Sequence, residues 1–312
     1  MSVTQQTSAA QQTAFDAVRV WVNGARADEG PALAALDHGI TVGDGVFETA
    51  KVQGTQVFAL TRHHERMDRS LRGLGLPALD RDRVQEGIDA VLADGPIELG
   101  RLRYTVTAGP GPLGSDRSGG PMTYIVTAGS APVASPATTV AVVPWTRNER
   151  AATVGLKTTS YADNVIALAT AKDLGATEAI FANTSGQLCE GTGSNIFVVL
   201  DGVVLTPSLP TGPLAGITRA LTIEWLTQEG IEVHEDELPL SILSEADEAW
   251  ITSSTRDVQG IDAVRVAGSA SSLAGQIAAA DISERTFGTA PGEFTRRAQE
   301  IFTRLGAEHP DP

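Results

Sequence analysis

Residues 190–197 read EGTGSNIF, and they follow Lys157, which stands in the segment GLKTTSY of residues 155–161. The chain has 23 lysines and arginines, of which only Lys51, Lys157 and Lys172 are lysines. An arginine does not lose its proton, whereas a partly desolvated lysine does, and a neutral amine attacks aldehydes. A lysine between apolar and hydroxyl residues therefore indicates amine chemistry, against the alternative of a simple buried or surface-lying lysine.

Length and composition describe a globular protein without a basic surface. The chain has 312 residues, 42% hydrophobic and 20% charged, which predicts two domains of ordinary size with sizeable cores. Its formal net charge is −15. Affinity for phosphate backbones and anionic membranes comes from basic patches, so we expect neither nucleic acid nor a membrane among the partners.

Cysteine usage and the first residues point to the cytoplasm. Cys189 is the one cysteine, so no intrachain disulfide forms, and we expect it to serve packing. No apolar run approaches the ~20 residues of a membrane span, and the opening residues lack the basic and apolar segments of a signal peptide. The five histidines are scattered, which gives no support for a zinc site.

Turn residues and periodicity divide the chain into two domains of mixed α and β structure. We predict a disordered tail at 1–14, a small α+β domain at 15–130, a linker at 131–137 and a large domain at 138–312. The elements we expect are a hairpin at Asn23-Gly24, a helix at 61–74 capped by Thr61, a helix from Asp82, strands at 46–52, 101–108 and 122–128, and, in the large domain, helices at 163–174, 218–229, 240–245 and 293–305.

Two segments have the composition of anion sites. Gly216 precedes a helix start, so the free N–H groups of Ile217 and Thr218 and the Thr218 hydroxyl are placed to hold an anion. Residues 250–256 read WITSSTR and end a buried-looking strand with four hydroxyls in a row. The alternatives are an ordinary capped helix and an ordinary turn.

Glu190 stands beside Gly191-Thr192-Gly193, where glycines leave room for a flat ligand against the backbone. A carboxylate there would pair with a pyridinium nitrogen and keep it protonated, which makes the ring an electron sink. The alternative is a solvated glutamate in a turn.

Together these segments resemble the class IV, or fold-type IV, pyridoxal-phosphate enzymes: branched-chain and D-amino-acid aminotransferases and aminodeoxychorismate lyase. The resemblance covers nearly all the chain and rests on Lys157, residues 190–197 and the GITR segment at 216–219. It implies a two-domain α+β and α/β fold with the cofactor, pyridoxal 5′-phosphate, at the domain interface. It also implies a homodimer acting on small amino and keto acids.

The resemblance assigns roles residue by residue. Lys157 matches the Schiff-base lysine and Glu190 the partner of the ring nitrogen. The remaining cofactor-binding positions are Arg66, Ile217, Thr218, Ser254, Gly193, Ser194 and Asn195. Arg66 matches an arginine of the family that reaches the phosphate; spacing alone does not choose it from Arg62, Arg69 and Arg72, whose pattern is typical of a solvated helix face.

Substrate positions follow the strand at 101–108, where Arg101 and Arg103 share one face and meet substrate carboxylates, or else form an exposed sheet face. Thr255, Arg256 and Phe47 are the other candidates. Branched-chain enzymes carry Tyr-x-Arg where this chain has Arg101-Leu102-Arg103, and lyases carry arginines and a tyrosine where residues 108–114 read AGPGPLG.

We therefore predict an aminotransferase that moves an amino group to a 2-keto acid, with the lyase, which releases pyruvate to form 4-aminobenzoate, as the alternative. A cofactor-binding protein without turnover is a third hypothesis, and Lys157 together with Glu190 argues against it. The amino donor and its handedness do not follow from the sequence.

Overall fold

The computed structural model describes residues 18–28, 31–268 and 282–312, so the predicted tail at 1–14 lies outside the described residues. The chain divides into two compact units. Unit 1 contains the described residues up to Pro132, together with Lys157–Ser160 and Asp311; unit 2 contains Val133–Leu156, Tyr161–Pro310 and Pro312. The division after Pro132 falls inside the predicted linker, but the grouping of Lys157–Ser160 with unit 1 was not predicted.

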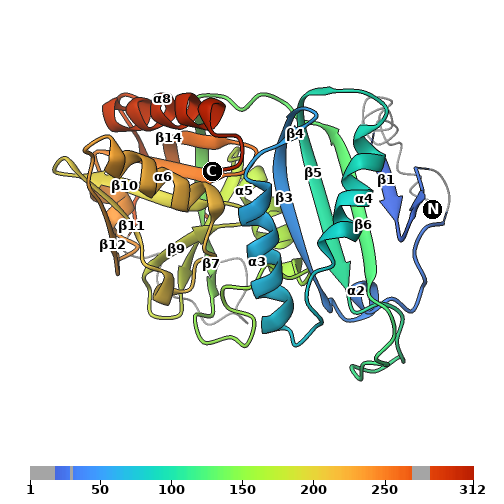
Figure 1. The fold of residues 1–312 in the computed structure, drawn as a ribbon. Helices are drawn as coiled ribbons and strands as arrows, with labels where there is room; N and C mark the ends of the chain where they lie inside the picture. Colours follow the sequence, from blue (N-terminus) through green and yellow to red (C-terminus); the bar gives the residue numbers. More distant parts are fainter. Residues whose placement is uncertain (1–17, 29–30, 269–281) are drawn as a thin grey trace, which may run out of the picture. The chain divides into compact units, whose positions relative to one another are not determined.

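Unit 1 is a six-stranded sheet with two helices on one face (Figure 1). The strand order is β2-β1-β6-β5-β3-β4, and every paired strand is antiparallel. Its elements are β1 (Arg19–Val22), β2 (Ala25–Arg26), α2 (His38–Thr41), β3 (Gly45–Gly54), β4 (Gln56–Val57), α3 (Leu60–Gly73), α4 (Arg81–Leu92), β5 (Ile97–Thr107) and β6 (Thr123–Ser130).

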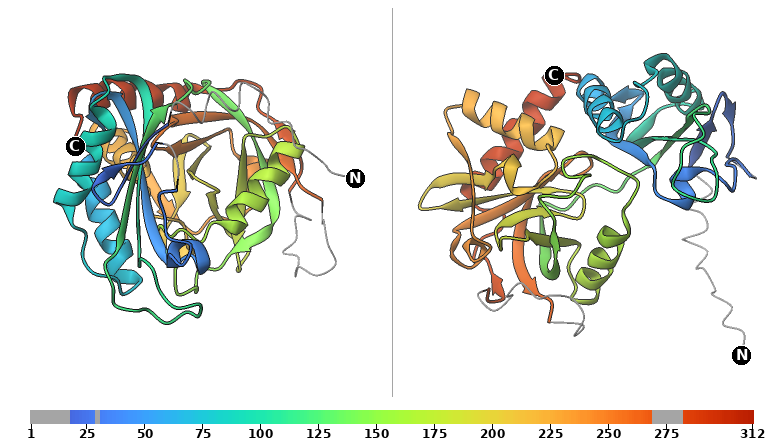
Figure 2. Two further views of the ribbon diagram at one scale, coloured as in Figure 1. Left: turned by 90° about the vertical axis from the view of Figure 1, so that its right-hand side faces the viewer. Right: turned by 90° about the horizontal axis from the view of Figure 1, so that it is seen from below.

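The alternation of buried and exposed residues along β5 explains how α3 and α4 cover this sheet (Figures 1 and 2). Leu102, Tyr104 and Val106 are fully buried beneath the helices, while Arg101 and Arg103 on the other face are exposed. Successive side chains of a strand point to opposite faces, so the predicted shared face of the two arginines is confirmed.

Unit 2 is built around a nine-stranded sheet in the described part of the chain. The order is β12-β11-β10-β13-β14-β7-β8-β9, with β15 paired to β14. Its elements are β7 (Ala137–Arg147), α5 (Ala162–Asp173), β8 (Glu178–Asn183), β9 (Leu188–Gly191), β10 (Asn195–Leu200), β11 (Val203–Pro207), the 3₁₀ turn η1 (Leu209–Thr211), α6 (Ile217–Gln228), β12 (Val233–Asp236), α7 (Ile242–Glu245), β13 (Glu248–Ser253), β14 (Asp257–Val266), β15 (Arg285–Thr286) and α8 (Glu293–Glu308).

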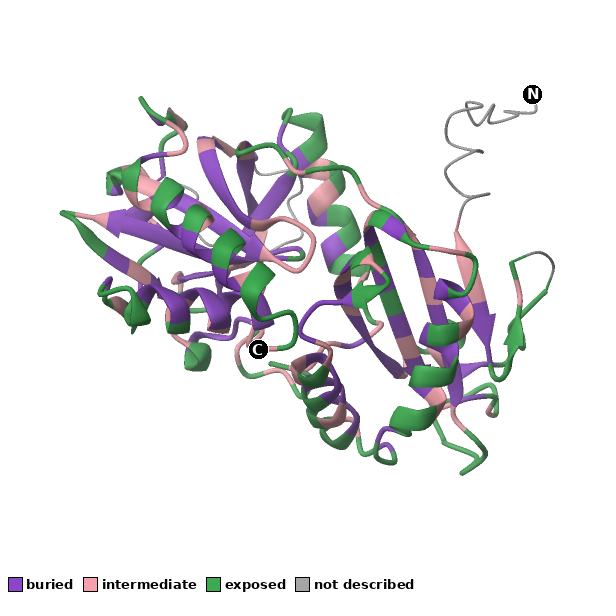
Figure 3. Ribbon diagram, turned by 45° about the horizontal axis from the view of Figure 1, so that its top comes forward, coloured by how far each residue is buried: buried purple, intermediate pink, exposed green. Residues whose placement is uncertain are grey.

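Helices pack on the sheet of unit 2, and its strands β8, β10 and β13 are mostly buried (Figure 3). All six residues of β8 are buried, because α5 packs on it through Ala167 and Ala171 and the other face enters a second apolar cluster. Helices α6 and α8 lie side by side, with the rings of Trp225 and Phe302 4.9 Å apart. None of the described helices is long and apolar enough to cross a membrane.

Turn chemistry agrees with the structure at the predicted Asn23-Gly24 hairpin and disagrees at one cap. Asn23-Gly24 joins β1 to β2 and Asp201-Gly202 joins β10 to β11, each pair with the positive φ angles that such tight turns require. Thr61 does not cap α3, and that prediction is wrong. The helix begins one residue earlier after Ala59, which has a left-handed backbone, and Thr61 bonds to the Asp311 carboxylate instead.

Candidate active site

Within unit 1, Lys157 is held along the edge of β3. The Phe47 amide donates to the Lys157 carbonyl at 3.0 Å, and the Thr159 amide donates to the Gly45 carbonyl at 2.8 Å. The Lys157 amide in turn donates to the Ser70 hydroxyl of α3 at 3.1 Å. Backbone bonds on both sides of the residue therefore fix where its side chain starts.

The half-buried Lys157 side chain contacts an aromatic ring that also contacts an arginine. Lys157 Nζ lies 4.6 Å from the centre of the Phe47 ring, and the Arg103 guanidinium lies 3.7 Å from the same centre. Both cations are attracted by the ring, which restrains them. The structure thus brings together three of the predicted site residues. Arg101 lies on the same face of β5 and is exposed, in register with Lys51.

On the helix-covered face of the same sheet, Arg66 forms a buried ion pair. Glu48, fully buried on β3, accepts from Arg66 Nε at 2.8 Å and from Arg66 Nη2 at 2.6 Å. The Nδ1 atom of His63 lies 2.7 Å from Glu48 Oε2. Arg66 is 4% exposed, whereas Arg69 and Arg72 are exposed and Arg62 is partly exposed, so burial separates Arg66 from its neighbours.

The charge state of this group follows from its surroundings. Burial alone would raise the pKa of Glu48, but the charge and hydrogen bonds of Arg66, with the hydrogen bond from His63, lower the pKa to about 2. Burial lowers the pKa of His63. His63 is therefore neutral at pH 7 and donates its Nδ1 proton to an ionised Glu48. Whether Arg66 also reaches a phosphate stays a prediction.

In unit 2, both carboxylate oxygens of Glu190 are held by donors. Glu190 Oε1 accepts from Arg147 Nε at 3.1 Å, and Oε2 accepts from the Leu214 amide at 2.9 Å. Arg147 lies over the Phe181 ring at 4.1 Å and donates through Nη1 to Asn164 Oδ1 at 2.9 Å. The carboxylate is thus oriented by its neighbours and is not the solvated glutamate of the alternative interpretation.

The start of α6 has the features of an anion site. Helix α6 begins at Ile217 with Gly216 as N-cap, and in the described part of the chain no protein acceptor bonds to the amides of Ile217 and Thr218. A Cβ at Gly216 would lie 1.9 Å from Asn195 Oδ1, so only glycine fits. Asn195 Nδ2 donates to the Leu214 carbonyl at 2.8 Å. The amides of Ile217 and Thr218 therefore suit a phosphate group.

The neighbouring strand end adds hydroxyl groups. Ser254, Thr255 and Arg256 form the turn between β13 and β14. Thr252, which pairs with Asn195 across the sheet, has a buried hydroxyl without a partner among the described residues. An orphaned buried donor is uncommon and fits a ligand oxygen.

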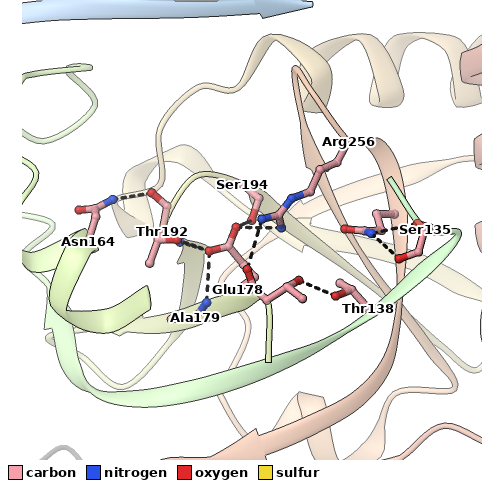
Figure 4. Close-up of polar contacts among 10 residues, drawn as sticks. Ser135, Thr138, Asn164, Glu178, Ala179, Thr192, Ser194 and Arg256 are labelled. Carbon is pink, nitrogen blue, oxygen red and sulfur yellow. Dashed lines mark hydrogen bonds and ion pairs between the residues drawn. The ribbon is translucent and has the colours of Figure 1, made fainter. Parts of the chain in front are cut away.

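Two predicted residues, Ser194 and Arg256, bond to a buried glutamate (Figure 4). Ser194 Oγ donates to Glu178 Oε2 at 3.1 Å, and Arg256 Nη1 lies 3.1 Å from the same oxygen. Apart from its chain neighbours, no described residue would lie within 4 Å of a Cβ at Gly193, so the loop has open space there. The predicted contacts of Gly193 and Ser194 with a cofactor, and of Thr255 and Arg256 with a substrate, stay predictions.

No group of acidic, histidine or cysteine side chains among the described residues could hold a metal ion. Cys189 is buried, with Sγ 3.7 Å from the Thr211 carbonyl. Burial raises the pKa of the Cys189 thiol, which keeps it protonated. This agrees with the predicted packing role.

Four supporting residues were not predicted. Glu48, Arg147 and Glu178 each bond to a predicted site residue, and Asn164 bonds to Arg147. A signal existed for Glu178, because it is the charged residue of a strand, EAIFAN, that is otherwise mostly apolar. Arg66, which the resemblance had selected, also had a local signal for burial, because it falls on the same helix face as Met67 and Ser70, both buried. Nothing local marks Arg147 and Asn164, whose roles depend on tertiary contacts.

The sequence of residues 45–264 matches the profile of the family described as amino-transferase class IV. The chain is 29% identical over 296 residues to the aminodeoxychorismate lyase of Bacillus subtilis, covering 91% of this chain and 94% of that protein. It is 28% identical over 244 residues to the branched-chain-amino-acid aminotransferase of Pseudomonas aeruginosa, covering 72% and 78%. Its fold is similar to that of a branched-chain aminotransferase from Thermoproteus uzoniensis, with a TM-score of 0.79 at 24% identity, over 94% of this chain and 96% of that one.

The chain belongs to the class IV aminotransferases. The predicted fold type, a two-domain fold-type IV enzyme of mixed helices and sheets, is confirmed by this structural neighbour. Enzymatic function is confirmed at the level of the family, which includes both transferases and lyases among its relatives.

Proposed function

We propose that this protein is a pyridoxal-phosphate-dependent aminotransferase that moves an amino group from an amino acid to a 2-keto acid, with Lys157 as the catalytic residue. The observation that carries this proposal is the contact of Lys157 and Arg103 with one Phe47 ring. Lys157, the candidate base, then lies beside Arg103, a cation suited to a substrate carboxylate. An amino-acid substrate needs both groups, one to take its Cα proton and one to bind its carboxylate.

When bound, pyridoxal phosphate supplies an aldehyde that condenses with amines and a ring that accepts electron density from Cα. The Lys157 amine holds the aldehyde before substrate arrives and, once released, takes and returns the Cα proton. Glu190, oriented by Arg147, keeps a proton on the ring nitrogen. The amides of Ile217 and Thr218 and the hydroxyl of Ser254 bind the phosphate.

The lyase reaction is the second candidate, because the relative from Bacillus subtilis aligns with 91% of this chain. Both reactions begin with proton removal at Cα, so Lys157 and Glu190 serve either one.

The test that distinguishes the two reactions is a spectrum of the protein with pyridoxal phosphate, before and after adding single L- or D-amino acids without an acceptor. Conversion to the pyridoxamine form by one donor supports transamination and reports its handedness. A visible band that no donor bleaches, with pyruvate released from aminodeoxychorismate, favours the lyase.

Replacing Glu190 with glutamine should lower kcat by roughly 10²-fold, because a neutral amide does not keep the ring nitrogen protonated. Pyridoxal phosphate should still bind, since the phosphate donors are unchanged. Steady-state kinetics and a cofactor titration measure the two effects separately. The control is Glu229→Gln, which removes an exposed partner of Arg304 at 2.7 Å in the same unit. Glu190→Gln turnover equal to that of this control would remove Glu190 from the mechanism.

Replacing Arg103 with methionine should raise KM for the amino donor about tenfold, because a charge-assisted hydrogen bond to the substrate carboxylate is lost. Methionine keeps an apolar contact with Phe47, so kcat should change less than KM. The matched variant is Arg101→Met, which lies on the same exposed face of β5 but is in register with Lys51. A larger rise in KM for Arg101→Met would reassign the carboxylate to Arg101.

A further inference from the structure

Glu178, the first residue of β8, is a carboxylate that is 1% exposed in the interior of unit 2 (Figure 4). Its Oε1 accepts from the Thr192 amide at 3.0 Å, from the Thr192 hydroxyl and from its neighbour Ala179. Its Oε2 accepts from Ser194 Oγ and from Arg256 Nη1, each at 3.1 Å. A buried carboxylate is costly unless it is paired and hydrogen-bonded, and these donors satisfy it.

The backbone of the loop is shaped around this carboxylate. A Cβ at Gly191 would lie 3.1 Å from Glu178 Cγ, 3.2 Å from its Cδ and 2.3 Å from Ser194 Oγ. A side chain at position 191 would therefore collide with the Ser194 hydroxyl, which donates to Glu178, and would crowd the Glu178 side chain itself. Glu178 and Gly191 together set the path of residues 192–194, which directly follow Glu190.

The same carboxylate also holds the turn that carries Ser254. Arg256, at the end of that turn, bonds to Glu178 through Nη1 and to the Thr177 carbonyl through Nη2 at 3.3 Å. One acidic side chain thus joins two segments that are distant in sequence. Each of these segments contains proposed cofactor-binding residues.

A chain of hydrogen bonds connects Glu178 to Glu190. Asn164 Nδ2 donates to the Thr192 carbonyl, and Asn164 Oδ1 accepts from Arg147 at 2.9 Å, which in turn holds Glu190. Displacement of the loop at Thr192 would therefore also shift the Glu190 carboxylate, which is proposed to face the ring nitrogen. An ion pair that only stabilised the core of unit 2 would not need a hydrogen-bonded connection to Glu190.

We propose that Glu178 is a positioning residue of the cofactor site, and this rests on the proposed function. It fixes the 192–194 loop and the 254–256 turn to one another. The Ser254 hydroxyl, proposed to bind the phosphate, and Glu190 then keep the spacing that pyridoxal phosphate requires. Arg256 then acts through Glu178, by neutralising and orienting its carboxylate, and not by binding the substrate.

The test compares pyridoxal phosphate affinity in wild-type protein and in Glu178→Gln. Glutamine keeps the size of the side chain but loses the charge that holds Arg256, so we expect the dissociation constant to rise at least roughly tenfold. Cofactor titration followed by circular dichroism of the bound chromophore gives this value without an activity assay. At saturating cofactor, kcat should recover partly.

A double-mutant cycle with Arg256→Met asks whether the two residues act as one unit. If Arg256 acts through Glu178, the double variant binds the cofactor no more weakly than the worse single variant. Effects that multiply would overturn the role given to Arg256.

The control for a purely structural role is Glu248→Gln. Glu248 in the same unit accepts from the Phe294 amide at 3.0 Å, the Thr295 amide at 2.9 Å and the Thr295 hydroxyl at 2.7 Å. This variant should melt at a lower temperature with unchanged cofactor affinity. If Glu178→Gln behaves in the same way, with a dissociation constant within twofold of wild type, Glu178 is structural and the inference fails.

Should Glu178→Gln not fold, Ser194→Ala removes one donor only and should weaken cofactor binding in the same direction. Unchanged affinity in that variant would overturn the proposal. Wild-type protein that binds no pyridoxal phosphate would overturn the proposed function and this inference with it. Wild-type binding with unaffected variants defeats the inference alone.

Discussion

Replacement of Lys157 by alanine is expected to lower turnover by at least about 10⁴-fold, because it removes both the amine that holds the cofactor and the base at Cα. The fold should survive. What Lys157 contributes to the backbone is its amide, bonded to Ser70, and its carbonyl, bonded to the Phe47 amide, and alanine keeps both. Steady-state kinetics and thermal melting measure the two quantities, and borohydride reduction of the wild-type protein with cofactor should label Lys157.

The matched control is Lys172→Ala. Lys172 is exposed in the last turn of α5 and has no proposed role, so its loss should leave turnover and the labelled peptide unchanged. Turnover by Lys157→Ala at the wild-type level would defeat the assignment of the catalytic residue. A label on Lys172 in the wild-type protein would do the same.

Local signals were enough to predict much of the fold. The alternation around Arg101 and Arg103 gave the face of β5, and Asn23-Gly24 gave a hairpin, because both depend on residues close in sequence. The helix at 61–74 was correct within a residue at each end. Its cap was wrong because the helix begins after Ala59, which has a left-handed backbone, and because Thr61 bonds to Asp311, a residue distant in sequence.

The candidate site was predictable as a set of residues but not as a set of contacts. Lys157 and Glu190 stand out by residue type and by the glycines around them. Their partners do not, because Arg147 and Glu178 are placed by strand pairing and by loops whose course no local pattern specifies. The grouping of Lys157–Ser160 with unit 1 is the same kind of fact, since it results from backbone pairing with β3.

Arg66 differs from the neighbouring arginines of its helix in being buried. The resemblance selected it from four arginines, and the structure gives the physical difference, which is burial against Glu48. An unpaired guanidinium at this position would be costly, so Arg66 and Glu48 must be treated as one unit. The stability of unit 1 should therefore be sensitive to a change in either partner.

Replacing Glu48 with glutamine should lower the free energy of unfolding by about 3–5 kcal/mol, because it removes the carboxylate charge that pairs with the buried Arg66 cation. Urea unfolding at pH 7 measures this loss. The folded pKa of Glu48 is about 2 against an ordinary value of 4.5, so its stabilising contribution is present above pH 4.5 and is lost as the pH falls toward 2. The difference in stability between wild type and Glu48→Gln should therefore shrink over that range.

The double variant Glu48→Gln with Arg66→Met separates the buried charge from the loss of packing. Removing both charges of a buried pair is often close to neutral, so the double variant should regain most of the stability that the single variant loses. It should also bind pyridoxal phosphate more weakly than wild type if Arg66 reaches the phosphate. If Glu48→Gln is instead as stable as wild type, the ion pair does not determine the stability of unit 1. Full recovery of stability with unchanged cofactor affinity would confine Arg66 to a structural role.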